Sequence, residues 1–161
     1  MTQQPARIVI GLISDTHGLL RASVHRALDG VDLILHAGDV GGAEILDELG
    51  LIAPVQAVSG NTDPADDPNL EESLSLQLGG LDVHVSHGHE LGSPTPAKLV
   101  AAHPHRVIVY GHTHRQMISR ISDQLVINPG AAGARRFDLA PSVARLTIEN
   151  GEAEAEIVPL D

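Results

Sequence analysis

Side chains that can hold metal ions recur in short polar segments of this 161-residue sequence. The segments are Asp15-Thr16-His17, Gly38-Asp39, Gly60-Asn61-Thr62-Asp63, His87-Gly88-His89 and Gly111-His112-Thr113-His114. They supply seven candidate metal ligands: Asp15, His17, Asp39, Asn61, His87, His112 and His114. Carboxylate, imidazole and amide donors without sulfur favour divalent ions such as Mn²⁺, Fe²⁺, Zn²⁺ or Ni²⁺. The segments therefore predict a metal site.

The number of candidate ligands exceeds what a single ion of this type requires, so we expect two ions. A carboxylate can bridge two ions, and two-metal hydrolases hold them about 3.5–4 Å apart. A water between the ions loses a proton and becomes a nucleophile, while both ions neutralise charge that develops on phosphoryl oxygens. This chemistry suits phosphoester hydrolysis, and Mn²⁺ is the first expectation for the metal.

The polar segments follow apolar runs that read as strands. Arg7–Ile13, Val31–Ala37 and Pro54–Val58 alternate with helical patterns at Leu19–Leu28 and Ala43–Leu49, which predicts a parallel α/β layer. In an open α/β sheet, ligands bind in the crevice beyond the carboxyl ends of the strands. The predicted elements therefore place the candidate ligands at one edge of a sheet.

The second half of the chain is richer in strand patterns. Three hairpins are expected, and they pair 72–78 with 81–86, 116–121 with 125–128, and 142–148 with 152–158. A helix is expected at Pro96–Ala102 and a buried strand at Arg106–Tyr110, while Asn61–Asn69 is expected to be a loop. Without repeats or a linker, residues 1–161 are expected to form one domain.

Composition limits the partners and the compartment. The chain has no cysteine, and its polar first residues, Met1 to Arg7, lack the apolar stretch of a secretory signal. No apolar run reaches the roughly 20 residues that span a bilayer, so a cytoplasmic protein without a membrane partner is expected. The formal net charge of −11 disfavours long nucleic acid, although bound cations would reverse the field locally. A small phosphate ester fits better.

The five polar segments, in their order and strand context, resemble the calcineurin-like metallophosphoesterase superfamily. The likeness runs from Ile8 to about Gly133. The short length and the Asn128-Pro129-Gly130 loop are most similar to the compact prokaryotic phosphodiesterase (YfcE-type) branch. The resemblance implies an α/β fold, a four-layer α/β/β/α sandwich in which helices flank two mixed sheets.

The same resemblance implies roles for the candidate ligands. Asp15, His17 and His114 would bind the first ion, and Asp39 would bridge both. Asn61, His87 and His112 would complete the second ion. The implied reaction is attack of metal-bound hydroxide on phosphorus, in line with the leaving oxygen. Asp39, Asn61 and His89 are the expected catalytic residues, and the expected role of His89 is to grip substrate.

One position departs from the family pattern. Larger phosphatases of the superfamily have a histidine directly after the motif asparagine, where it protonates the leaving group, and the compact branch often has cysteine. This chain has Thr62, whose hydroxyl is no general acid near neutral pH. We therefore expect a phosphodiesterase that prefers esters with a leaving oxygen of low pKa.

The roles of other polar residues are less specific. His36 is either a partner of a metal ligand or a buried histidine with satisfied hydrogen bonds. Arg135 and Arg136 either reach a phosphate or are simply exposed. Asp63 is expected to orient its own loop or a metal-bound water. His84 is expected on a strand surface, and His103 and His105 in a solvated loop.

Competing functions are a catalytically weak metal-binding scaffold, like a eukaryotic trafficking subunit that the fold resembles, and a nuclease of the same superfamily. The intact ligand set favours the enzyme over the scaffold, and the acidic charge opposes binding of long nucleic acid. Short apolar strands that could pair across a two-fold axis leave a homo-oligomer open.

Overall fold

The computed structural model describes residues 7–136 and 138–161, so the polar segment before Arg7 lies outside it. Its elements, in chain order, are β1 (Arg7–Ile13), α1 (Ser23–Ala27), β2 (Leu33–His36), α2 (Ala43–Leu49), β3 (Val55–Ala57), β4 (Leu74–Leu78), β5 (Leu81–Val85), the 3₁₀ helix η1 (His89–Leu91), α3 (Pro96–Ala102), β6 (Val107–Val109), β7 (Met117–Ile121), β8 (Gln124–Asn128), β9 (Ser142–Glu149) and β10 (Glu152–Pro159). All three predicted hairpins are present.

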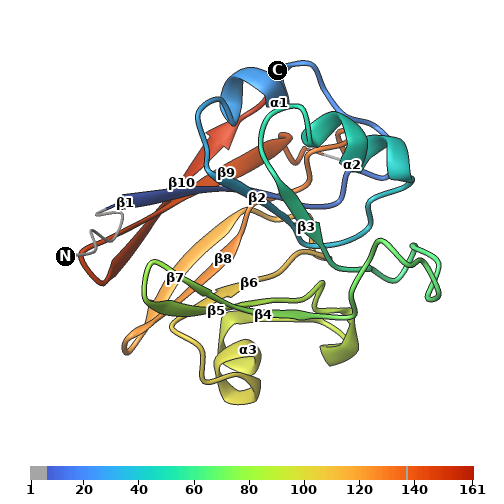
Figure 1. Cartoon of the computed structure of the whole chain (residues 1–161). Coiled ribbons are helices and arrows are strands. Elements are labelled where there is room, and N and C mark those ends of the chain that lie inside the picture. The colour runs from blue at the N-terminus through green and yellow to red at the C-terminus, as the bar shows by residue number, and fades with distance from the viewer. Residues whose placement is uncertain (1–6, 137) are drawn as a thin grey trace.

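Two mixed sheets lie face to face between helices (Figure 1). One sheet has the order β10-β9-β1-β2-β3 and the other β4-β5-β6-β8-β7. The first sheet packs its outer face on α1 and α2, and the second packs its outer face on α3. This is the four-layer α/β/β/α sandwich of two mixed sheets that the family resemblance implied.

Strand β1 shows why the apolar runs were readable from sequence. Ile10 and Leu12 point into the core between the sheets, whereas Val9 and Ile13 pack toward the helices. A strand that is covered on both faces carries a continuous apolar run rather than an alternating one. The same rule made the buried strands β2 and β6 recognisable.

The parallel strands share one carboxyl edge. In the first sheet β1, β2 and β3 run parallel, and in the second sheet β5, β6 and β8 run parallel. The polar segments that follow β1, β2, β3, β5 and β6 therefore emerge at that edge. In the part of the chain that the structure describes, no helix is long and apolar enough to cross a membrane.

The helix predicted over Leu19–Leu28 is wrong in its first turn, because α1 begins only at Ser23. The backbone before it is engaged elsewhere: His17 N–H donates to Asp39 O, and Gly18 N–H donates to Val40 O, both at 2.9 Å. Within the missing turn itself, the Arg21 guanidinium donates to Gly133 O and Asp161 O, so contacts with distant segments hold this stretch in place of a helical turn.

Candidate metal centre

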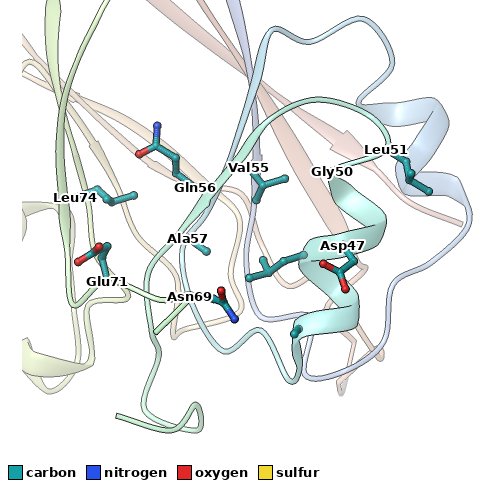
Figure 2. A pocket seen from close by; sticks show the side chains of 11 residues that line it. Asp47, Gly50, Leu51, Val55, Gln56, Ala57, Asn69, Glu71 and Leu74 are labelled. Atoms are coloured by element: carbon teal, nitrogen blue, oxygen red, sulfur yellow. The ribbon is translucent and has the colours of Figure 1, made fainter. Parts of the chain in front are cut away.

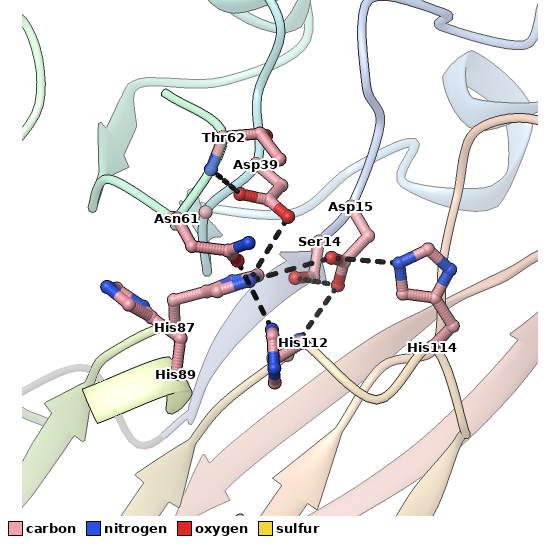
Figure 3. Close-up of polar contacts among 12 residues, drawn as sticks. Ser14, Asp15, Asp39, Asn61, Thr62, His87, His89, His112 and His114 are labelled. Carbon is pink, nitrogen blue, oxygen red and sulfur yellow. Dashed lines mark hydrogen bonds and ion pairs between the residues drawn. The ribbon is translucent and has the colours of Figure 1, made fainter. Parts of the chain in front are cut away.

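The structure gathers all seven predicted ligands at the carboxyl edge of the strands. Figure 3 labels all of them except His17. We call Asp15, His17, Asp39, Asn61, His87, His112 and His114 the carboxylate–histidine centre. Two sets within it have donor atoms that all lie within 4.8 Å of one another: Asp15, His17 and His114, and Asp15, Asp39 and His87. Asn61 Oδ1 lies 3.2 Å from His112 Nδ1 beside them.

The two carboxylate oxygens of Asp15 have different surroundings. Oδ2 accepts hydrogen bonds from the Ser14 hydroxyl at 2.7 Å and the His112 N–H at 3.2 Å. Oδ1 instead faces three imidazoles, with Nε2 of His114, His17 and His87 at 3.3, 3.7 and 3.8 Å. One oxygen fixes the side chain, which leaves the other directed at the centre.

The two carboxylate oxygens of Asp39 also have different surroundings. Oδ1 accepts the Thr62 N–H at 2.9 Å, and Oδ2 lies 3.5 Å from His17 Nε2 and 3.3 Å from His87 Nε2. Asp39 belongs to the second set, and its Oδ2 also reaches His17 of the first set, while Asp15 is a member of both sets. Gly60 permits this approach, since a methyl group there would overlap the Asp39 carboxylate.

Three atoms of the centre are buried and have no hydrogen-bond partner among the described residues: Asp15 Oδ1, His17 Nε2 and His87 Nε2. Buried polar atoms are nearly always paired, so such a group points to a ligand. The His87 tautomer agrees, because Nδ1 lies 2.8 Å from the Ala37 carbonyl and must donate to it. Its Nε2 lone pair is then directed at the two carboxylates, and the residues fit divalent ions.

The backbone of the centre is held in sparsely populated conformations. Among the described non-glycine residues, positive φ values occur at Asp15, His17, Asp39, His112 and His114, and otherwise only at Ser122 and Asn150 in two hairpins. A left-handed backbone at a non-glycine residue is unfavourable and clusters at functional sites. Five of the seven predicted ligands thus carry strain.

The carboxylates and imidazoles of the centre shift each other's pKa. Burial raises the pKa of Asp15 and Asp39, but their hydrogen-bond and imidazole neighbours outweigh it, so that Asp15 ends well below its ordinary value and Asp39 at about 2. The Asp15 carboxylate raises the pKa of His17, and for His87 the two carboxylates outweigh burial and raise the pKa as well. Both carboxylates are therefore ionised and ready to bind cations.

Behind the ligands, His36 joins two ligand segments. The Thr16 hydroxyl donates to Val40 O at 2.7 Å, so it accepts from His36 Nε2–H at 3.0 Å. His36 Nδ1 then accepts the Gly38 N–H at 3.1 Å. Full burial lowers the pKa of His36 to about 4, which keeps the ring neutral. His36 is therefore the buried histidine with satisfied hydrogen bonds, and it supports the segments that carry Asp15 and Asp39 through Thr16 and Gly38 rather than through a predicted ligand.

Asp63 and Asn128 also fix the ligand segments. The Asp63 carboxylate accepts N–H groups of Val40, Gly41 and Gly60 at 2.9–3.2 Å, which confirms the loop-orienting role. Asn128 Nδ2 donates to Gly111 O and Thr113 Oγ1, and its Oδ1 accepts the Gly130 N–H. Sequence reasoning had missed the contribution of Ser14, for which the only signal is a hydroxyl directly before the ligand Asp15.

Residues at the rim of the centre include the expected substrate-gripping histidine. The His89 ring lies 5.4 Å from the His87 ring and 6.3 Å from the His112 ring, and 39% of its side chain is exposed. Arg135 and Arg136 are exposed, and the positive charge of Arg136 lies close enough to His17 to oppose the rise in that histidine's pKa.

The expectation that His84 lies on a strand surface is wrong, because only 6% of the residue is exposed. The rings of His103 and His105 cover it at centroid distances of 3.7 and 5.1 Å. These two residues are half-buried rather than solvated. We call His84, His103 and His105 the three-histidine cluster.

Of two cavities in the structure, one lies away from the centre and the other adjoins it. A cavity of about 600 Å³ lies between α2, β3 and the segment leading into β4, away from the predicted ligands (Figure 2). A second cavity, of about 570 Å³, is lined by Asn61 and His89 and extends to His84 and His103. The second cavity therefore joins the centre to the three-histidine cluster.

Comparison with known proteins agrees with the site. A model of the calcineurin-like phosphoesterase superfamily domain matches residues 8–151. A probable metallophosphoesterase of Methanocaldococcus jannaschii is 35% identical over 163 residues, covering 96% of this chain and 82% of that protein. The fold and the clustered metal-ligating residues are those of a metallophosphoesterase, and the chain belongs to the calcineurin-like phosphoesterase superfamily. The predicted family is confirmed.

Two further relatives differ in what their names describe. A phosphodiesterase of Methanocaldococcus jannaschii is 27% identical over 139 residues, covering 75% of this chain and 82% of that protein. The structure of vacuolar protein sorting 29 from Cryptosporidium parvum is 22% identical, with a TM-score of 0.81 over 97% of this chain and 99% of its own. At that identity, the likeness shows the shared fold.

Proposed function

We propose that this chain is a dinuclear-metal-dependent phosphodiesterase. The observation that carries the proposal is the orientation of the two carboxylates. Asp15 Oδ1 and Asp39 Oδ2 each face two or more imidazoles, while the other oxygen of each carboxylate accepts hydrogen bonds from the protein. A carboxylate between two ligand sets is the feature that a two-ion site requires. The relative named as a phosphodiesterase supports the reaction class.

The proposed ligands divide into two sets with one shared member. Asp15, His17 and His114 would hold one ion, Asn61, His87 and His112 would hold the other, and Asp39 would serve both. Two divalent ions would supply a deprotonated water as nucleophile and neutralise charge on the phosphoryl oxygens. Mn²⁺ is the proposed metal, since nitrogen and oxygen donors without sulfur accept it.

The chain's own residues then position a small phosphate ester. His89, exposed at the rim, donates to a phosphoryl oxygen, and Arg136 adds positive charge beside His17. The overall charge of −11 opposes a long nucleic acid at this entrance. A dinucleotide or a cyclic nucleotide still fits the chemistry, and such substrates agree with a cytoplasmic enzyme.

Thr62 limits the leaving group. Its backbone N–H is used by Asp39 Oδ1, and its hydroxyl is no acid near neutral pH. We expect bis-p-nitrophenyl phosphate to turn over at least about 100-fold faster than an alkyl monoester, the scale of a missing general acid. Steady-state rates with both substrates check this, and equal rates would contradict the role assigned to Thr62.

The function is tested by turnover of bis-p-nitrophenyl phosphate by the metal-stripped protein with and without added Mn²⁺. We expect activity only with the metal, and near-complete loss in Asp39→Asn and His112→Ala. His25→Ala is the matched control, because His25 pairs with Glu48 on the helix side of the molecule. A folded wild-type protein without metal-dependent turnover would reject the enzyme and favour the metal-binding scaffold.

A further inference from the structure

The three-histidine cluster is the second place where metal-ligating side chains converge. His84 lies on β5, and His103 and His105 lie between α3 and β6. One ring nitrogen from each histidine can be chosen so that all three lie within 4.8 Å of one another. We propose that these three imidazoles form a separate site for one zinc ion.

Serine hydroxyls orient two of the rings. Ser86 Oγ lies 3.0 Å from His84 Nε2, and Ser75 Oγ lies 2.9 Å from His105 Nε2. When each Nε2–H donates to its serine oxygen, the lone pair of the ring stands on Nδ1. Outer hydrogen bonds of this kind commonly fix the tautomer of a metal-binding histidine.

An unpartnered atom gives the independent sign of a ligand. His105 Nδ1 is buried and has no hydrogen-bond partner in the part of the chain that the structure describes. Outside the carboxylate–histidine centre, Ser23 Oγ is the only other buried side-chain atom in this state among those residues. His105 thus shares with His17 and His87 a buried ring nitrogen without a partner.

The charge of the surroundings also suits a cation. Burial, together with the neighbouring rings, lowers the pKa of His84 to about 4, and burial lowers that of His103 as well, so both rings are neutral ligands near pH 7. The negative charge of Glu90 acts on both rings, and Glu72 and Glu90 line the adjoining cavity. Water can complete the coordination.

The donor chemistry selects the metal. Three imidazoles with an open fourth position are a common zinc arrangement, in which Zn–N is about 2.0–2.1 Å and ligands stand roughly 3.3 Å apart. The His84 and His103 rings are stacked at a centroid distance of 3.7 Å, so the half-buried His103 ring must turn away from His84 before both can bind one ion. Ni²⁺ and Cu²⁺ also favour imidazole, whereas Mn²⁺ and Mg²⁺ favour oxygen donors. The ion would tie β5 to the segment between α3 and β6.

The test counts zinc in a protein whose carboxylate–histidine centre is disabled. In the metal-free double variant Asp15→Asn/Asp39→Asn, zinc is titrated under equilibrium dialysis and measured by mass spectrometry. We expect about one ion per chain, with at least a 10-fold weaker affinity after adding His103→Ala and no change after adding His25→Ala. His103 is half-buried, so its loss should not unfold the chain, and circular dichroism checks this.

In the wild-type protein, zinc should also shift the imidazole resonances of His84, His103 and His105. Unchanged zinc affinity after His103→Ala, or a folded double variant that binds no zinc, would overturn the proposal. These readouts do not use catalysis. Failure of Mn²⁺-dependent turnover would therefore reject the proposed enzyme and leave the zinc site standing.

Discussion

The carboxylate–histidine centre and the three-histidine cluster gather imidazoles in opposite electrostatic settings. In the centre, Asp15 and Asp39 raise the pKa of His17 and His87. In the cluster, burial and neighbouring imidazoles lower the pKa of His84 to about 4. Carboxylates allow a site to hold two dications close together, whereas neutral imidazoles alone suit one borderline ion.

The two regions also differ in backbone strain. Five ligands of the centre have positive φ, whereas none of the three clustered histidines does. Strained residues persist only where the surrounding structure over-determines them. Here the hydrogen bonds of Asp63, His36 and Asn128 supply that constraint. The difference agrees with the two proposals: the proposed two-ion site has a fixed backbone, while the proposed zinc site depends on side-chain movement.

The largest expected effect separates the two regions by activity. Asp15→Asn keeps the shape of the side chain but removes the charge that faces three imidazoles, so we expect Mn²⁺-dependent turnover to fall about 1,000-fold, or about 4 kcal/mol of transition-state stabilisation. His103→Ala should change turnover by less than about two-fold. Initial rates on bis-p-nitrophenyl phosphate measure both effects. Similar losses of activity in both variants would show that the two regions form a single functional site.

A smaller effect is expected on the pH dependence of stability. Each region contains a buried histidine with a lowered pKa, His36 behind the centre and His84 in the cluster. The folded-state pKa of His36 is about 4 against an ordinary 6.5, so the unfolded chain binds the extra proton between these values. Stability is therefore retained above pH 6.5 and lost as the pH falls toward 4, by about 3 kcal/mol from His36 alone.

Urea unfolding of the metal-free protein between about pH 7 and pH 4 measures this loss. His36→Asn should flatten the profile by most of that amount. His25→Asn, which changes a helix residue paired with Glu48, should leave the slope as in the wild type. An unaltered slope in His36→Asn would show that His36 is not kept neutral by burial.

That the candidate ligands gather in one place was predictable, because parallel strands end at one edge of their sheet. Strand β1 is buried on both faces and α2 matches its predicted bounds, so the segments that follow the strands had to meet at one edge. Which oxygen of each carboxylate bonds to the protein and which faces the imidazoles was not predictable. It depends on contacts such as Thr62 N–H to Asp39 Oδ1, which only the folded backbone creates.

The buried state of His84 was unpredictable for a different reason. Asp82 and His84 in β5, and Ser86 just after it, alternate with valines, and such alternation ordinarily marks a solvent face. The cover comes from His103 and His105, about twenty residues later in the chain. The start of α1 was missed in the same way, because Arg21 in the expected first turn bonds to Gly133 and Asp161, which lie far away in the sequence.

The last prediction asks whether the fixed backbone itself matters for metal binding. Asp63→Ala removes the acceptor of three N–H groups without touching a predicted ligand. We expect Mn²⁺ affinity and turnover to fall about 10–100-fold, the usual effect of losing a group that orients metal ligands. Asp66→Ala, the same charge change at an exposed position of the same loop, should change neither by more than about two-fold.

Calorimetric titration with Mn²⁺ and turnover at saturating Mn²⁺ separate the two consequences. If the strained loops are what Asp63 maintains, excess metal should restore much of the activity, because the ligands themselves remain. Zinc binding at the three-histidine cluster should be unaffected, since Asp63 holds none of its rings. Full Mn²⁺ affinity in Asp63→Ala would mean that the strained conformations are stable without that carboxylate, and the contrast between a fixed and an adjustable site would lose its physical basis.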